Sequence, residues 1–371
     1  MNAIFTAPRR RSHIVVALTL ATIVVLLGVL ARPSPPSLST QVTGDPALAA
    51  TVRPNLPGVG DRVSVVTIDG DTVTYAHFGA NNDTEYEIGS LTKTVTSLLL
   101  ADAIARGEVT ADTKVGDLLP LAGTAVADVS LAELASHRSG LPLVATRLQD
   151  MVPLYLLAVT HRNPYIQDVD GVIALARAAN LSHRGQFAYS NLGGALLGHA
   201  LASASNTDYE RLVQERVFTP LGMTASSVPV TAGDLPDDAP TGYSVTGRAE
   251  PPWTMNGWAP AGGIRSTPAD MVRYAQALLD GSAPGIDALT PRWESDLDAF
   301  APRWESGEQK VGYAWFTEEI EGKIVTWHDG GTGGFASIIV LDRASHRAVI
   351  ILSNSNASVN DAAITLLAGE R

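Results

Sequence analysis

The chain has 371 residues, a formal net charge of −12 and no cysteine. The acidic balance argues against a nucleic-acid-binding protein, because that affinity needs Lys and Arg side chains to neutralise phosphates. The absence of cysteine excludes disulfides, thiolate metal sites and a cysteine nucleophile.

The first 31 residues have the pattern of a targeting or anchoring segment. Arg9, Arg10 and Arg11 precede an uncharged apolar run over residues 14–31, which as a helix would span about 27 Å, close to one hydrocarbon core. Because positive charge stays on the cytoplasmic side, we expect a single-pass membrane protein whose remaining chain lies outside the cytoplasm. Cleavage near Ala31 would instead give a secreted protein.

The segment after the apolar run is rich in proline and serine. Residues 32–57 therefore predict an extended linker, and residues 58–371 are long enough for one large domain. Within it, residues 63–68 and 72–78 predict a β-hairpin, because Asp69-Gly70-Asp71 between them is a turn signal.

Helical periodicity follows the hairpin, and strand patterns return near the end of the chain. Strands at both ends with helices between them predict an α/β sheet that carries an inserted helical region. The predicted helices cover residues 91–105, 131–136, 170–180, 192–204, 208–217, 268–280 and 359–367. The predicted late strands cover residues 311–317, 323–328, 335–341 and 347–353. Pro-Arg-Trp-Glu-Ser occurs at residues 291–295 and again at 302–306, which we interpret as a duplication in a surface loop.

Ser90 and Lys93 form the first motif that indicates chemistry. They are three residues apart at the start of a predicted helix, so both side chains lie on one face. Serine is a weak nucleophile until a nearby base takes its proton, and a lysine amine one turn away can do so. Amides at a helix N-terminus also favour negative charge. The alternative is a structural N-cap serine beside a solvated lysine.

Three further motifs follow in order: Ser136-His137-Arg138-Ser139-Gly140-Leu141-Pro142, Tyr189-Ser190-Asn191 and His328-Asp329-Gly330-Gly331. Together with Ser90-x-x-Lys93 they resemble the serine β-lactamase/penicillin-binding-protein family, and within it the class C β-lactamases with their esterase and D-peptidase relatives. The resemblance covers residues 60–370. It implies an antiparallel sheet formed by the N- and C-terminal segments, flanked by helices, with an inserted all-α subdomain.

The resemblance also implies roles for individual residues. Ser90 would be acylated, Lys93 would assist proton transfer and Tyr189 would act as general base. Four further residues would line the substrate site: Asn191, His328, Gly330 and Gly331. Asn191 would hold either a substrate amide or Lys93. The amides of Gly331 and Ser90 would together form an oxyanion hole.

The residues themselves leave two candidates for the general base, Tyr189 and Lys93. Ionising the Tyr189 phenol, whose ordinary pKa is near 10, costs roughly 4 kcal/mol at neutral pH, and a lysine cation about 4 Å away returns about 4 kcal/mol at an effective dielectric constant of 20. Neutralising Lys93 costs a similar amount. We favour Tyr189 acting together with Lys93.

The motif at residue 328 departs from the lactam-recognising pattern, in which a Lys and a Thr meet the substrate carboxylate. His328 is mostly neutral at pH 7, and Asp329 supplies no cation. This predicts weak β-lactamase activity and better turnover of uncharged esters or amides. Arg138 and Arg265 are the remaining candidates for binding a carboxylate.

The sequence thus predicts an extracytoplasmic serine hydrolase that acts on a small ester or peptide through a Ser90 acyl-enzyme. One alternative is a D-Ala-D-Ala carboxypeptidase or D-aminopeptidase of cell-wall peptides. The other is a catalytically silent, membrane-anchored binding module. No cofactor and no metal are expected, because the eight histidines show no metal-ligand spacing.

Overall fold

The computed structural model describes residues 19, 21–22, 35–236, 238–295, 308–320 and 322–369. Residues 36–371 make up one compact unit. Nearly all of the apolar run over residues 14–31, and the second Pro-Arg-Trp-Glu-Ser copy, lie outside the described residues. Within the described ranges, no helix combines the length and the apolar character needed to cross a bilayer.

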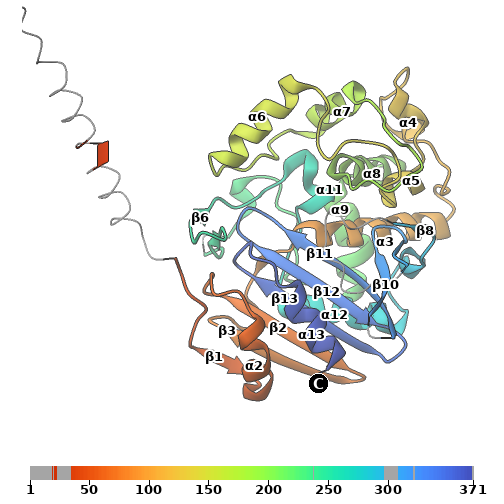
Figure 1. Cartoon of the computed structure of the whole chain (residues 1–371). Helices are drawn as coiled ribbons and strands as arrows, with labels where there is room; N and C mark the ends of the chain where they lie inside the picture. The colour runs from red at the N-terminus through yellow and green to blue at the C-terminus, as the bar shows by residue number, and fades with distance from the viewer. Residues whose placement is uncertain are drawn as a thin grey trace, which may run out of the picture. The chain divides into compact units, whose positions relative to one another are not determined.

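An antiparallel sheet is the framework of this unit (Figure 1). Among the described residues it has nine strands in the order β1-β3-β2-β13-β12-β11-β10-β9-β8, so N-terminal strands lie beside C-terminal ones. The sheet is therefore built from both ends of the chain, which confirms the predicted fold class. The strands are β1 (Val42–Gly44), β2 (Val63–Asp69), β3 (Thr72–Phe78), β8 (Trp293–Glu294), β9 (Lys310–Val311), β10 (Phe316–Ile320), β11 (Lys323–Gly331), β12 (Ala336–Asp342) and β13 (Arg347–Ser353).

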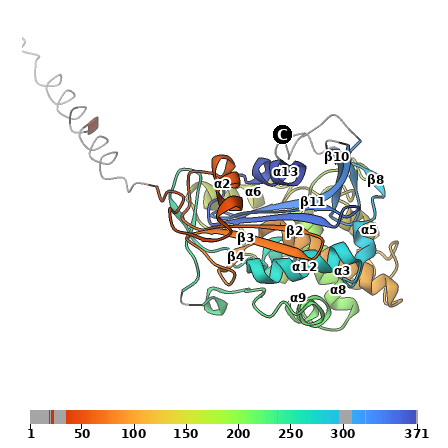
Figure 2. The same ribbon diagram turned by 90° about the horizontal axis from the view of Figure 1, so that it is seen from below.

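Helices cover both faces of the sheet (Figure 2). The helices on one face are α2 (Pro46–Val52) and α13 (Asn360–Ala368), and those on the other include α3 (Thr92–Ala105) and α12 (Pro268–Asp280). In β13, Val349 and Ile351 pack into the core on the α13 side, whereas Ile350 and Leu352 pack into the core on the α3 side. Burial on both faces explains why β13 is a continuous apolar run instead of an alternating one.

The middle of the chain forms the inserted helical subdomain. Its helices are α4 (Val115–Leu118), α5 (Leu131–Ala135), α6 (Leu148–Val159), α7 (Val169–Ala178), α8 (Asn191–Ala204), α9 (Tyr209–Val213), α10 (Thr219–Leu221) and α11 (Ala259–Gly262). Two short strand pairs accompany them: β4 (Tyr86–Glu87) with β7 (Arg265–Ser266), and β5 (Gly242–Tyr243) with β6 (Ala249–Glu250). Helix α6 was not predicted. Pro153 lies inside it, and proline within a sequence segment indicates a helix break.

The expected linker over residues 32–57 differs from the structure over most of its length. Strand β1 pairs with β3, and Asp45 caps α2 by accepting a hydrogen bond from the Leu48 amide at 2.7 Å. An aspartate before a proline is a helix-start signal, which the proline and serine content of the segment obscured. The compact unit therefore begins near Pro36, about twenty residues earlier than predicted.

The strand expected over residues 311–317 is interrupted. It is divided into β9 and β10 because Ala314 adopts a φ of 60°, a left-handed conformation that a strand does not accommodate.

Candidate active site

Ser90 lies in a short 3-10 turn, η2 (Gly89–Leu91), that leads directly into α3. Lys93 is in the first turn of α3, and its Nζ donates to Ser90 Oγ at 3.0 Å and to the Ala261 carbonyl at 2.6 Å. The Lys93 residue is only 2% exposed. The predicted pair is therefore in direct contact, and the structural alternative of a solvated lysine is wrong.

Tyr189 approaches this pair from the loop before α8. It forms a hydrogen bond with Ser90, and Lys93 Nζ lies 4.9 Å from the centroid of its ring. Ser190 starts α8 by accepting a hydrogen bond from the Gly193 amide at 2.9 Å, which fixes the turn that presents Tyr189. The hydroxyl, the amine and the phenol therefore meet in one place, although the tyrosine lies about one hundred residues from the serine in sequence.

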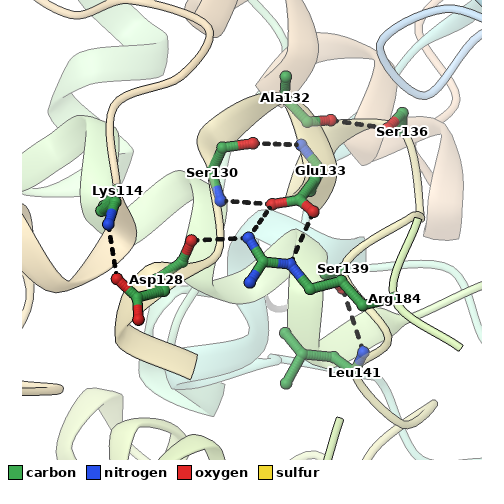
Figure 3. A network of polar contacts seen from close by, with 9 residues as sticks. All are labelled: Lys114, Asp128, Ser130, Ala132, Glu133, Ser136, Ser139, Leu141 and Arg184. Atoms are coloured by element: carbon green, nitrogen blue, oxygen red, sulfur yellow. Dashed lines mark hydrogen bonds and ion pairs between the residues drawn. The ribbon is translucent and has the colours of Figure 1, made fainter. Parts of the chain in front are cut away.

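A polar network holds the segment that supports Tyr189 (Figure 3). Ser130 and Glu133 form a reciprocal capping box at the start of α5. Arg184 donates to both carboxylate oxygens of Glu133, each at 2.7 Å. The network fixes α5, whose C-terminal end leads into His137.

His137 packs flat against Tyr189, with ring centroids 4.3 Å apart and an interplanar angle of 28°. Its Nδ1 accepts a hydrogen bond from the Ser190 amide at 3.2 Å, so a neutral His137 carries its proton on Nε2. Burial lowers the His137 pKa well below its ordinary value. His137 therefore positions the phenol as a neutral ring.

His328 lies near the end of β11, with its ring 6.4 Å from that of Tyr189. Its Nδ1 donates to the Asp329 carbonyl at 2.5 Å, and its buried Nε2 has no hydrogen-bond partner among the described residues. Burial, with a smaller contribution from the Lys93 charge, lowers the pKa of His328 to about 3. The ring is thus neutral at pH 7 and brings no positive charge to the site.

The end of β11 packs tightly against the turn that carries Ser90. A Cβ on Gly330 would lie 2.0 Å from the Ile88 carbonyl oxygen, and a Cβ on Gly89 would lie 2.6 Å from the Gly331 amide nitrogen. Only glycines allow this approach, and Gly89 also has a φ of 51°. The Gly331 amide is consequently beside the Ser90 turn, which is the arrangement that two amides of an oxyanion hole require.

Asn191 follows Tyr189 by two residues and lines the same region. Its Nδ2 donates to the Tyr165 hydroxyl at 2.9 Å, and its Oδ1 is buried without a hydrogen-bond partner among the described residues. Lys93 donates to Ser90 and to the Ala261 carbonyl, so Asn191 does not hold the lysine in this structure. Of the two roles expected for Asn191, binding a substrate amide remains.

Sequence reasoning missed Tyr165. Its ring lies 5.1 Å from Trp253 and 5.3 Å from Trp258, both in edge-on contact. Tyr165 belongs to no motif, so nothing in its sequence context indicated an aromatic wall beside Asn191.

The charged residues considered for a substrate carboxylate have different positions. Arg265 is 1% exposed and bonds Glu85 and Glu87, each at 2.6 Å, so its charge is already compensated. Arg138 is half-buried, donates its Nε–H to the Gly185 carbonyl at 2.9 Å and packs over Trp293. Of the two arginines, only Arg138 has terminal nitrogens left for a ligand.

Asp329 points to the opposite face of the sheet from His328, as strand alternation requires. Its Oδ2 accepts a hydrogen bond from Asn360 of α13 at 2.8 Å. Its charge nevertheless acts on both Lys93 and Tyr189. Asp329 therefore contributes negative potential at the site where the lactam-recognising pattern has none.

The two candidate bases respond oppositely to burial. Burial lowers the pKa of Lys93 to about 7, although the Asp329 charge opposes this shift. Burial raises the pKa of Tyr189 well above its ordinary value, and its hydrogen bond with Ser90 offsets only part of that shift. Lys93 is therefore the readier proton acceptor at neutral pH. This differs from the preference for Tyr189 based on sequence, which did not include the desolvation of the phenolate.

Comparison with known proteins agrees with the geometry. A family model described as Beta-lactamase matches residues 53–369. Beta-lactamase-like protein 2 of Dictyostelium discoideum is 30% identical over 224 residues, which cover 56% of this chain and 38% of the relative. The D-alanyl-D-alanine-carboxypeptidase/endopeptidase AmpH of Escherichia coli strain K12 is 30% identical over 232 residues, which cover 58% of this chain and 57% of that protein. The chain thus spans about 40 to 60% of the length of these relatives.

The fold also has a close counterpart among solved structures. A class C beta-lactamase superposes with a TM-score of 0.70 at 20% identity, covering 87% of this chain and 95% of that structure. At this level of identity the likeness establishes the fold, and the chemistry depends on the residues of this chain.

Proposed function

Since this chain belongs to the beta-lactamase family of serine hydrolases, we propose that it hydrolyses esters or peptide-like amides through a Ser90 acyl-enzyme. The observation that carries the proposal is the contact of a buried lysine with the serine hydroxyl, 3.0 Å from Nζ to Oγ. A lysine in this position with a pKa of about 7 can accept a proton at neutral pH.

The proposed reaction begins when Ser90 Oγ attacks the substrate carbonyl and its proton passes to Lys93 Nζ. The oxyanion that forms is held by the amides of Ser90 and Gly331. Tyr189 is protonated before the reaction, because burial raises its pKa. It therefore donates its proton to the leaving group and then receives a proton from Lys93. Water then attacks the acyl-enzyme. The proton transfers between these groups run in the reverse direction, so that Ser90 regains its proton.

The charges of the site favour substrates without a carboxylate near the reacting carbonyl. His328 is neutral, Arg265 is paired with two glutamates and Asp329 adds negative potential. A carboxylate brought next to these groups would lose its hydration without gaining a cation. We therefore infer that neutral esters and amides are better substrates than β-lactams, whose carboxylate the family pattern binds with Lys and Thr.

A cell-wall peptidase is the second candidate function. The name of the AmpH relative describes a D-alanyl-D-alanine carboxypeptidase and endopeptidase, and the half-buried Arg138 offers one cation for a peptide carboxylate. Release of D-alanine from a D-Ala-D-Ala peptide, lost in the Ser90→Ala variant, would support it. Turnover of esters with no release of D-alanine would count against it.

The location of the protein is a further part of the proposal. Three arginines before the apolar run over residues 14–31 support an N-terminal membrane anchor with the hydrolase unit outside the cytoplasm. Cleavage near Ala31 would release the same unit as a secreted enzyme. Protease protection of the full chain in intact cells, with and without permeabilisation, distinguishes an outside from an inside orientation.

The test of the chemistry is hydrolysis of p-nitrophenyl butyrate, combined with intact-mass analysis after exposure to a fluorophosphonate. We expect Ser90→Ala to lose both activity and labelling. Ser97→Ala is the matched control, because Ser97 lies in the same helix with its hydroxyl donated to the Thr94 carbonyl at 2.8 Å. Unchanged hydrolysis in Ser90→Ala would overturn the proposal, and a folded wild-type protein that never labels would favour a catalytically silent binding module.

A further inference from the structure

Exposed apolar side chains are concentrated in one short part of the chain. Among the described residues, twelve large hydrophobic side chains are exposed, and nine of them fall between residues 143 and 169. Six lie on α6 and form what we term the apolar stripe: Leu148, Met151, Val152, Tyr155, Leu156 and Val159. They recur at intervals of three or four residues, so they share one face of the helix.

Helix α6 is apolar along most of its length, yet it packs little of that apolar surface on the core. The only residue of α6 that is buried is Leu154, whereas Leu148 is 75% exposed and Tyr155 is 69% exposed. In an ordinary surface helix the apolar face packs on the core. A contiguous exposed apolar patch of this kind indicates an interaction surface.

Charged residues lie at both ends of the apolar stripe. Arg147 precedes α6 and Arg162 follows it closely, and both are exposed. Leu and Tyr side chains between basic residues are typical of helices that lie in the interface of a bilayer, with the cations at the level of the phosphates.

The chain also offers little length between the apolar run and the hydrolase unit. Residues 32–36 separate the end of that run from the first contacts of the unit, and five extended residues span at most about 18 Å. An apolar run that crosses a bilayer would therefore keep some surface of the hydrolase unit close to the lipid.

A continuous set of contacts connects the start of the unit with α6. The Pro36 carbonyl accepts from the Gly60 amide, and Gly60 packs against Ser355. Ser355 bridges to β5, β5 pairs with β6, and Glu250 of β6 bonds His161, two residues after α6. Contacts thus run from the point where the chain enters the unit, through β5 and β6, to the segment that follows α6.

We propose that the apolar stripe of α6 docks in the interface of a lipid bilayer. This goes beyond the proposed hydrolysis and does not depend on it. The same segment contacts the active site at both ends, because the Leu143 carbonyl accepts from the Asn191 amide at 2.9 Å and Tyr165 accepts from the Asn191 side chain. Docking would therefore hold the Asn191 side of the site close to the membrane surface.

The test uses the full chain, in which the absence of cysteine allows a single label at a chosen position. Tyr155→Cys and Ile324→Cys, labelled with nitrobenzoxadiazole, are mixed with phosphatidylethanolamine–phosphatidylglycerol vesicles with or without doxyl-labelled lipid. Ile324 is the matched control, since it is 61% exposed at the start of β11, away from α6. We expect a blue shift and doxyl quenching at position 155 and neither at position 324.

Three results would overturn the proposal: protein that does not float with the vesicles, bound protein whose position 155 is neither shifted nor quenched, or a shift without vesicles that grows with protein concentration. The last would indicate contact between copies of the chain. A triple variant, Leu148→Ser with Tyr155→Ser and Leu156→Ser, provides a second measurement on residues 36–371, which contain both hydrophobic clusters of the described residues. It should weaken vesicle binding by at least about tenfold and leave hydrolysis of a soluble ester unchanged.

Discussion

The protonation state of Lys93 should control the rate of acylation. Burial lowers its pKa to about 7, and only the neutral amine can take the Ser90 proton. A single group with that pKa is about one tenth neutral at pH 6 and about nine tenths neutral at pH 8. We therefore expect kcat/KM for p-nitrophenyl butyrate to rise about tenfold between pH 6 and pH 8 and then to level off.

Variants at Tyr189 separate the two possible bases. If Lys93 is the base, Tyr189→Phe lowers the rate but keeps the rise centred near pH 7. A rate that is flat from pH 6 to pH 9, or that keeps rising toward the ordinary pKa of lysine, would refute the assignment. So would a Tyr189→Phe variant in which the rise near pH 7 has disappeared.

The same pKa has a consequence for stability. Lys93 has a lower pKa in the folded protein than in the unfolded chain, so between pH 7 and pH 10 the unfolded chain binds more protons and stability rises with pH. We expect the free energy of unfolding of the wild type, relative to Lys93→Met, to increase by about 3 to 4 kcal/mol over that range. Urea denaturation at pH 7, 8.5 and 10 measures the difference, and a constant difference would show that Lys93 is not desolvated as the structure indicates.

Three other predictions concern residues around the site. Gly330→Ala should remove activity and lower the Tm, because its Cβ would lie 2.0 Å from a backbone carbonyl oxygen. Gly331→Ala should fold normally, because its Cβ would meet nothing nearer than 4.0 Å. Equal melting temperatures of the two variants would contradict this prediction. Arg265→Met should cost about 3 to 5 kcal/mol in urea denaturation, because it leaves the buried Glu87 carboxylate unpaired, and a loss below 1 kcal/mol would show that the pair is not needed. Asp329→Asn keeps a hydrogen-bond acceptor for Asn360 but removes the negative charge. The kcat/KM for nitrocefin, divided by that for a neutral ester, should therefore rise about tenfold. An unchanged ratio would show that Asp329 does not influence the preferred charge of the substrate.

The parts of the site that the sequence predicted depend on local geometry or on the order of motifs. Ser90 and Lys93 meet because residues three apart on a helix share a face whatever the rest of the fold does. The glycines at 330 and 331 followed from the family resemblance, and the structure gives Gly330 a steric reason in the carbonyl of Ile88. The hairpin of β2 and β3 followed from a turn signal between two β-branched runs.

The relative basicity of the two proton acceptors could not be predicted in this way. Judged from the sequence, the attraction of a lysine cation was enough to offset the free energy of ionising the Tyr189 phenol. That comparison used a distance between the two groups but no measure of their burial. Desolvation disfavours both charged forms, so it raises the pKa of the phenol and lowers that of the amine. Burial arises from residues distant in sequence, such as Ala261 and His137.

The amino-acid sequence by itself determined the contact of Ser90 with Lys93, the fold class and the family resemblance, since these follow from short spacings and from the order of motifs along the chain. Only the tertiary structure decided that Arg265 is enclosed by two glutamates, that the segment before residue 57 is folded, and that the apolar face of α6 points outward. The physical reason is that a sequence pattern shows which residues can share a face, whereas packing decides what each face meets.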